Sequence, residues 1–272
     1  MSQHIFKCKT PDAFQMKVLI DLLSVSLPKV SCSISNNGIS SRSIDNNHNK
    51  VFDLHLDQEY FEIFKFKSKA PIDLGITLSN FHKMLKSIKK KDFLELFIHP
   101  NSETKLGIRT IPSSLENARV TTTEITIQNI PHLDIEIPDG YDKHIVVPAS
   151  QFQNMCKDLR NVGSNLITVT SKGFSISFSC DADSVMKRTV EFGDPNESDD
   201  EDDEETYRQT FPTEQFTSIQ KISGLASKLQ IYRKMGLPLL IRANIGVKSY
   251  LSIYMYSNEL KESIPADDSE TE

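Results

Sequence analysis

The sequence is poor in the residues from which compact metal, disulfide and nucleotide sites are built. It holds four cysteines, ten glycines and no tryptophan in 272 residues. The cysteines are scattered and form no C-x-x-C pair, which argues against a zinc knuckle, a redox motif or a disulfide framework. We therefore expect all four to be small buried hydrophobic residues. They are Cys8, Cys32, Cys156 and Cys180.

Catalytic motifs are also missing from the sequence. It contains no phosphate-binding P-loop, no G-x-G-x-x-G and no G-x-S-x-G. The arrangement most like a metal site is Asp53-x-His55-x-Asp57, in which a period of two places three possible ligands on one face of a strand. The residues between them are apolar, as in an ordinary amphipathic strand. We therefore predict a protein that is not an enzyme, with no catalytic residue, no metal and no cofactor.

Long apolar runs are absent as well. No stretch reaches the roughly 18 consecutive apolar residues of a membrane span. Residues 1–10 have neither the charged nor the apolar region of a signal peptide. We expect a soluble intracellular protein with no membrane partner.

The net charge of −6 conceals an uneven distribution along the chain. Residues 194–205 hold nine acids and no base, and residues 259–272 hold six acids and one lysine. The rest of the chain therefore has 22 acids against 30 lysines and arginines, an excess of about eight positive charges. Acidic runs of this kind are typical of solvated, disordered segments, and we expect a disordered acidic tail over residues 259–272.

Four segments have the apolar period of a helix, and three of them repeat one pattern. The segments are residues 12–26, 79–90, 150–161 and 213–225, and the last three share F-x-x-[MI]-x-K. At about 100° per residue the Phe and the residue three positions later share a face, whereas the Lys lies about 140° away from the Phe. We therefore expect the apolar face to pack and the Lys to face outward. The repeated residues are Phe81, Met84 and Lys86, then Phe152, Met155 and Lys157, then Phe216, Ile219 and Lys221.

Between these segments the sequence changes to a period of two, which predicts half-buried antiparallel strands. The clearest examples are residues 51–57, 93–98, 166–170, 173–180, 239–243 and 250–256. The order of strands and helices occurs twice, with an extended, helix-poor stretch between the halves. We predict an α+β protein with two similar domains at 1–125 and 139–258, joined by a linker at 126–138.

Several segments, in shared order and spacing, resemble the proliferating cell nuclear antigen family of eukaryotic and viral DNA sliding clamps over essentially the whole chain. They are residues 38–48, 74–86, 135–138 (IEIP), 152–163 (FQNMCKDLRNVG) and 237–239 (LPL). The resemblance implies a ring-shaped homotrimer of two-domain subunits, with helices lining the hole and antiparallel strands forming a continuous outer sheet. It implies a replication processivity factor that encircles duplex DNA and tethers polymerase and other replication and repair proteins.

The resemblance also implies a set of bases that face the DNA backbone. A protein that slides along DNA needs positive charge aimed at phosphates from rigid elements, without contacts to the bases. Surface lysines can instead be merely solubilising, but recurrence at one helical phase favours a role in binding. Met16 and Asn154 stand where relatives usually carry a base, and Arg160 is an addition specific to this sequence. The predicted DNA contacts are Lys17, Lys83, Lys86, Lys157, Arg160 and Lys221.

A second implied surface is an apolar depression below the linker, where partners insert short peptides with two aromatic anchors. Exposed apolar residues in a linker favour such a role, because they are costly unless a partner covers them. Asn49 and Tyr256 depart from the family pattern, which predicts a different peptide preference. The predicted partner-binding residues are Ile44, His48, Val51, Ile135, Ile137, Pro138, Pro238 and Tyr254.

Assembly and partners also follow from the resemblance. The subunit contact would pair residues 119–125 of one copy with residues 184–192 of the next, and an ATP-driven clamp loader would open the ring. We expect the protein to act in the nucleus, or at a cytoplasmic replication site if the source is viral. Three alternatives stay open at this point: a subunit of a checkpoint-type heterotrimeric ring, a monomeric viral processivity factor, and an interaction scaffold that does not bind DNA.

Overall fold

The computed structural model describes residues 4–113, 119–130, 134–141, 143–182, 186–193 and 206–263. The first half of the chain contains β1 (Phe6–Thr10), α1 (Ala13–Ser26), β2 (Lys29–Ser35), β3 (Gly38–Ile44), β4 (Lys50–Asp57), η1 (Gln58–Tyr60), β5 (Ile63–Phe66), β6 (Ile72–Thr77), α2 (Leu78–Leu85), β7 (Phe93–His99), β8 (Ser102–Ile111) and β9 (Thr121–Thr126). The second half contains β10 (His144–Pro148), α3 (Ala149–Val162), β11 (Leu166–Lys172), β12 (Ser175–Ala182), β13 (Met186–Phe192), β14 (Tyr207–Pro212), α4 (Thr213–Ile219), η2 (Gln220–Gly224), β15 (Lys228–Tyr232), β16 (Leu239–Gly246), β17 (Ser249–Met255) and α5 (Asn258–Ser263).

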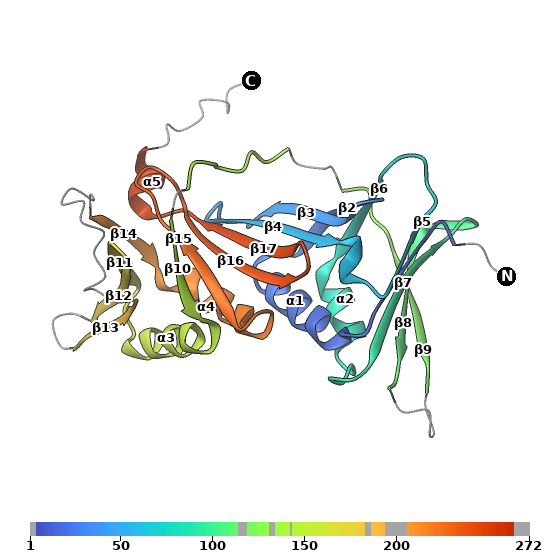
Figure 1. Cartoon of the computed structure of the whole chain (residues 1–272), viewed down its shortest axis with the longest axis horizontal. Helices are drawn as coiled ribbons and strands as arrows, with labels where there is room; N and C mark the ends of the chain where they lie inside the picture. The colour runs from blue at the N-terminus through green and yellow to red at the C-terminus, as the bar shows by residue number, and fades with distance from the viewer. Residues whose placement is uncertain are drawn as a thin grey trace.

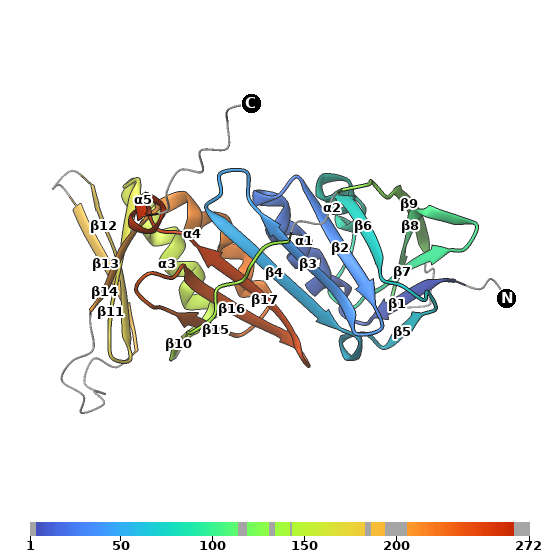
Figure 2. The same cartoon turned by 90° about the horizontal axis from the view of Figure 1, so that it is seen from above.

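The strands form three antiparallel sheets. The largest runs β10-β15-β16-β17-β4-β3-β2-β6, and the smaller ones run β5-β1-β7-β8-β9 and β13-β12-β11-β14. The two halves of the chain meet inside the largest sheet, because β17 pairs with β4 from Tyr250 opposite His55 to Met255 opposite Lys50. Figure 2 shows this sheet across the middle of the molecule, with β13 toward one end and β9 toward the other. The prediction of two α+β units with antiparallel sheets is confirmed.

The four long helical segments lie together on one side of the large sheet. In Figure 1 α1, α2, α3 and α4 occupy the lower side, whereas the linker between β9 and β10 crosses the upper side. Helix α1 packs against α2 and η2, while α3 packs against α4 and η2. The order across this helical layer is therefore α2, α1, α4 with η2, and α3.

The side chains of the repeated pattern point in the predicted directions, with the phenylalanines inward and the lysines outward. Phe81, Phe152 and Phe216 are buried, with exposed fractions of 4%, 0% and 0%. Lys86 and Lys157 are exposed on the opposite side of their helical segments, and so is the third lysine, Lys221. The helical phase read from the sequence is thus confirmed in all three segments.

Two of the predicted helices are shorter than expected. Helix α2 ends at Leu85 and not at Lys90, because Ile88 turns into the core and the Asp92 carboxylate accepts the Lys89 N–H at 2.9 Å. The segment predicted over 213–225 is divided into α4 and the 3-10 helix η2. By contrast, α1 starts as predicted at the Asp12 cap, whose carboxylate accepts the Gln15 N–H at 2.9 Å.

One contiguous hydrophobic core runs through both halves of the chain. The four cysteines are buried and free, as predicted. Burial raises the pKa of Cys32 to about 11 and that of Cys156 to about 12, so both thiols stay neutral near pH 7. No helix in the ranges that the structure describes is long and apolar enough to cross a membrane.

The first residues of the predicted acidic tail are helical. Residues 258–263 form α5, and the Glu259 carboxylate accepts hydrogen bonds from the Thr210 N–H at 2.9 Å and from the Thr210 hydroxyl at 2.5 Å. Burial alone would raise the pKa of Glu259, but these hydrogen bonds lower it below its ordinary value. The prediction of disorder from residue 259 is therefore wrong for residues 259–263. The reason is that the Glu259 carboxylate binds a backbone N–H of the edge strand β14, at Thr210. The acidic run at 194–205 lies outside the described residues.

The start of the linker is fixed against β6 by a close backbone approach. The Gln128 N–H donates to the Gly75 carbonyl at 2.8 Å. A Cβ atom at position 75 would lie 2.1 Å from the Gln128 carbonyl oxygen, so only glycine fits there. The linker therefore leaves the first half of the chain in a defined direction.

Candidate functional site

Four of the six predicted DNA contacts are free on the outer members of the helical layer. Lys83 and Lys86 lie on α2 and at its end, and Lys157 and Arg160 lie on α3. All four are exposed, and none forms an ion pair within the described part of the chain. Free bases on rigid helices are suited to sequence-independent contact with phosphates.

Lys17 has a different position from the one that the pattern suggested. Its ammonium donates to the Lys86 carbonyl at 2.7 Å and to the Ile88 carbonyl at 3.4 Å. Carbonyls at a helix C-terminus lack partners within the helix, and a lysine there satisfies them. Lys17 therefore joins α1 to the end of α2, and its ammonium is less available to a phosphate than those of Lys83 and Lys86.

Lys221 lies in the middle of the helical layer beside an acid. Its ammonium is 3.6 Å from the Asp21 carboxylate of α1, and the same carboxylate lies 2.6 Å from Nε2 of His82 on α2. Asp21 is a helix position that the sequence reading had not singled out, because its partners come from two other helices. Part of the positive charge of Lys221 is therefore balanced within the protein.

The missing base at Met16 has a structural reason. Met16 is 4% exposed and belongs to the core, so a charged side chain there would be buried without a partner. Asn154, the other position without a base, is exposed on α3. Only the second position thus removes a charge from the surface of the helical layer.

A separate apolar cluster lies on the other side of the large sheet, below the linker. Five of the predicted partner-binding residues belong to it, and the structure adds four others, of which Tyr256 was expected only to alter the peptide preference. The predicted members are Ile44, Val51, Ile135, Ile137 and Tyr254; the added members are Tyr141, Tyr232, Leu240 and Tyr256. We call these nine residues the linker cluster. It is distinct from the main core: Val51, Leu240 and Tyr254 are buried, and the other six members are partly buried and packed against them.

Two hydrogen bonds join neighbouring segments around the linker cluster. The Arg42 guanidinium donates to the Ile135 carbonyl at 3.4 Å, and the Tyr141 hydroxyl donates to the Pro238 carbonyl at 2.6 Å. Burial, together with the charge of Asp53, raises the pKa of Tyr254 to about 12. The cluster is therefore uncharged at ordinary pH, with Tyr254 buried beneath its partly exposed members and the linker tied to the sheet beside it.

His48 and Pro138, also predicted for this site, lie outside the linker cluster. His48 is exposed in the turn between β3 and β4, with a positive φ of 51°. The Asp45 carboxylate shapes that turn by accepting the N–H groups of Asn49 and Lys50 at 2.7 and 2.8 Å. Pro238 is not a member of the cluster, but its carbonyl oxygen accepts the hydrogen bond from Tyr141. Partner contacts at all eight predicted residues, His48 and Pro138 included, stay predictions.

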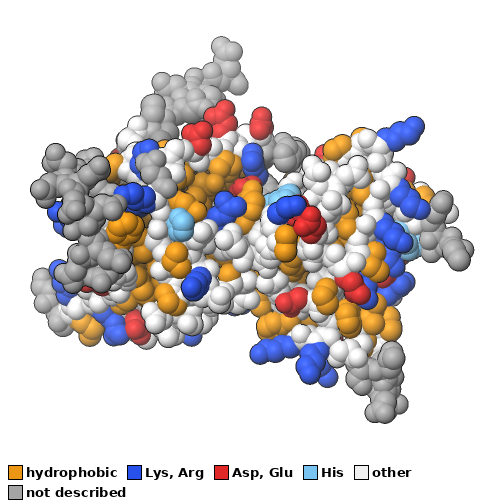
Figure 3. Space-filling model, in the orientation of Figure 1, with side chains coloured by type: hydrophobic (Ala, Val, Ile, Leu, Met, Phe, Trp, Pro, Cys, Tyr) orange, Lys and Arg blue, Asp and Glu red, His pale blue; other side chains and the backbone are white. Residues whose placement is uncertain are grey.

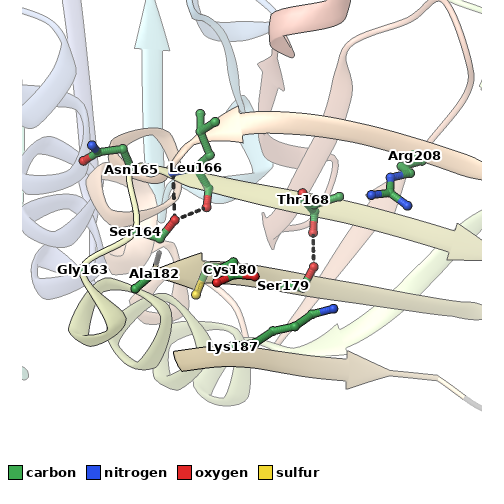
Figure 4. Close-up of a pocket in the computed structure, with 11 residues that line it drawn as sticks. Gly163, Ser164, Asn165, Leu166, Thr168, Ser179, Cys180, Ala182, Lys187 and Arg208 are labelled. Carbon is green, nitrogen blue, oxygen red and sulfur yellow. Dashed lines mark hydrogen bonds between the residues drawn. The ribbon is translucent and has the colours of Figure 1, made fainter. Parts of the chain in front are cut away.

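A polar hollow of about 480 Å³ lies on the small sheet of the second half (Figure 4). Thr168 and Ser179, which are joined by a hydrogen bond of 3.4 Å, line its floor beside Lys187 and Arg208. Its lining includes no histidine, and burial raises the pKa of Cys180 above its ordinary value.

The two segments predicted to form the subunit contact are both edge strands. β9 ends one small sheet and β13 ends the other, and each pairs with one strand among the residues that the structure describes. A hollow of about 300 Å³ lies between β9 and α2, with Asn80, Met84 and Glu124 in its lining. Unpaired edges of this kind are ready to extend a sheet into another chain. Residues 184 and 185 of the second segment lie outside the described part.

Comparison with known proteins gives one family for the whole chain. The N-terminal domain of proliferating cell nuclear antigen matches residues 5–131, and the C-terminal domain of the same protein matches residues 136–258. A relative described as a probable DNA polymerase sliding clamp from Paramecium bursaria Chlorella virus 1 is 29% identical over 89% of this chain and 92% of its own length. Proliferating cell nuclear antigen of Chaetomium thermophilum is 22% identical over 92% of this chain and 97% of its own length.

The fold has a counterpart among solved structures. The crystal structure of proliferating cell nuclear antigen from Entamoeba histolytica superposes with a TM-score of 0.80, over 94% of this chain and all of that one, at 19% identity. The two domain matches, the full-length relatives and the shared fold lead to one conclusion. The chain belongs to the proliferating cell nuclear antigen family and is a DNA sliding clamp, a processivity factor of DNA replication.

Proposed function

We propose that three copies of this chain close into a ring around duplex DNA, with the helical layer facing the hole. One observation carries the proposal: four helices lie together on one side of the eight-stranded sheet, and the outer two, α2 and α3, present exposed bases that form no ion pair in the described residues. The two small sheets end in the edge strands β9 and β13. Phosphates are contacted without reading the bases, so the ring can slide. The chain acts by encircling and tethering, and no step of catalysis is assigned to it.

The ring would close through β9 of one copy and β13 of the next. The two edges belong to different surfaces of the subunit, so their pairing is head-to-tail and closes only if the rotation between copies allows a ring. β9 carries Glu124, and β13 carries Lys187 and Arg188. Backbone pairing would supply most of the contact, and the hollow beside β9 gives room for side chains of the neighbour.

The linker cluster would receive the aromatic anchors of short peptides from DNA polymerase and other replication and repair proteins. Its lining is apolar and aromatic, and it lies on the side of the sheet opposite the helices. DNA and peptide would therefore occupy different sides of the same subunit. A closed ring cannot thread long DNA, so we assign its opening to an ATP-driven clamp loader. We place this work in the nucleus, or at a cytoplasmic replication site for a viral chain.

Sedimentation equilibrium of the full chain tests the assembly. One chain has a mass of 30.8 kDa, so a homotrimer is expected at about 92 kDa. A mass near 31 kDa at micromolar concentration would overturn the ring and favour a monomeric processivity factor. A trimer that fails to bind duplex DNA at low salt would instead favour an interaction scaffold.

A further inference from the structure

The turn that follows α2 carries a run of lysines that neither the repeat nor the family resemblance pointed to. Lys89, Lys90 and Lys91 are exposed and directly follow the core residue Ile88. With Lys86 they place four bases within six residues. Figure 3 shows basic side chains projecting from the lower edge of the molecule, the side on which the helices lie in Figure 1. We call Lys89, Lys90 and Lys91 the lysine turn.

The lysine turn is fixed at both ends. Ile88 is 3% exposed and anchors it in the core. Asp92, which is 7% exposed, accepts the Lys89 N–H through its carboxylate and the Ala13 N–H of α1 through its carbonyl, at 2.9 and 3.3 Å. The ammonium of Lys17 fastens the preceding carbonyls. The three lysines therefore start from a rigid backbone, which lowers the entropic cost of binding a partner.

The lysine turn carries more positive charge than the acids beside it. Asp12 and Asp92 are the neighbouring acids, and their carboxylates accept backbone N–H groups of Gln15 and Lys89. No side chain of the lysine turn forms an ion pair in the described ranges. The ammonium of Lys90 lies 5.9 Å from the Phe14 ring of α1, which holds it toward the helical layer.

The equivalent place in the second domain is built differently. There α4 continues into η2, which has one lysine, Lys221, beside Asp21. η2 also packs closely against α1, since a Cβ atom at Gly224 would lie 2.8 Å from Cγ1 of Val18. The connection from η2 into β15 has the single exposed base Lys228, at the start of the strand, whereas the turn after α2 has three in a row.

We propose that the lysine turn is an additional contact for the phosphate backbone of duplex DNA, which makes the N-terminal domain the stronger DNA-binding half of each subunit. The proposal rests on the proposed ring around DNA. A fixed group of unpaired ammonium ions on the helical side is complementary to a polyanion and to no particular base sequence. Lys89, Lys90 and Lys91 would then add to the contacts of Lys83 and Lys86.

The test measures how duplex binding depends on salt. Full-length protein in which Lys89, Lys90 and Lys91 are replaced by Ala is titrated onto a short fluorescent duplex between about 50 and 200 mM salt. Each lost phosphate contact lowers the slope of log K against log salt by about 0.9, so we expect a fall of about 2 to 3. Replacing all three by Arg should keep the slope, because the charge is kept.

A matched control lies in the same domain. Lys65, Lys67 and Lys69 are also three exposed lysines, on and after the edge strand β5 and away from the helical layer. Their replacement by Ala should leave the slope within about half a unit of the original. Equal slopes for the two triple variants would overturn the proposal. If Lys83→Ala plus Lys86→Ala also leaves the slope unchanged, the proposed ring contact fails as well, so the two failures can be told apart. Sedimentation mass confirms that each variant is assembled.

Discussion

The flanks and the centre of the helical layer both carry lysines that the sequence predicts to face outward, yet the surroundings of these lysines differ. On the flanks, α2 and α3 present Lys83, Lys86 and Lys157 without an ion pair in the described residues. In the centre, Lys17 is held by carbonyls of α2 and Lys221 lies beside Asp21. The comparison teaches that helical phase sets the side to which a base points, whereas the neighbouring helix decides whether its charge is free.

The largest expected effect comes from removing the flank bases. Replacing Lys83, Lys86, Lys157 and Arg160 together by Ala should lower the slope of log K against log salt by about 3 to 4. Duplex affinity near physiological salt should fall on the order of a hundred-fold or more. In the matched centre variant, Lys17→Ala plus Lys221→Ala, the slope should change by about 1 or less. Equal losses in both variants would remove the distinction between flank and centre.

Substitutions in the linker cluster, on the opposite side of the sheet, should not affect DNA binding by the flanks or the centre of the helical layer. Ile137→Ala plus Tyr254→Ala truncates two walls of the linker cluster, and loss of such an anchor site costs about 2 kcal/mol or more. A peptide with two aromatic anchors should then bind roughly thirty-fold more weakly by calorimetry. Ring mass and the salt slope for DNA should stay unchanged. Unaltered peptide binding would show that partners dock elsewhere.

Removing one carboxylate should free a lysine in the centre of the helical layer, as the lysines on the flanks are free. Asp21→Asn removes the carboxylate that lies 3.6 Å from the Lys221 ammonium and 2.6 Å from His82. The freed ammonium should steepen the salt slope by up to about 1 and raise duplex affinity a few-fold. Glu62→Gln is the control, because it frees Lys9, which alternates with the buried Cys8 and so faces away from the core. No gain in the Asp21 variant would mean that Lys221 does not reach DNA.

The smallest effect concerns the ionisation of the linker cluster. Burial raises the pKa of Tyr254 from an ordinary value near 10 to about 12, so the folded state disfavours tyrosinate. The stability that this provides is fully present below about pH 10 and is lost as the pH rises toward 12. The fall of the melting temperature over that range should be smaller in Tyr254→Phe than in the original chain. An identical fall in both would assign the alkaline loss to other groups.

Much of the architecture could be predicted from periodicity. The buried phenylalanines and the outward lysines follow from helical phase, and the strands follow from alternation, because both are local properties of the chain. Five residues of the linker cluster came from the family resemblance. The length of α2 was wrong, since the Ile88 anchor and the Asp92 cap that end it are not visible as periodicity.

The features that could not be predicted depend on contacts between distant segments. The partners of Lys17 and Lys221 come from other helices, so the repeat gave no sign of them. Tyr141 and Tyr232 join the linker cluster from two separate parts of the second domain, and neither sits in a distinctive motif. Glu259 orders the start of the acidic tail only because a backbone N–H at the edge of β14 is available to it.

Retention on DNA of different topology tests the central claim most directly. The protein is loaded by an ATP-driven clamp loader onto a nicked circular plasmid and separated by gel filtration at a salt concentration that screens simple electrostatic binding. A ring that encircles DNA should stay with the circle and be lost when the plasmid is cut once, because it slides off the ends. Equal retention on circular and linear DNA would contradict encirclement.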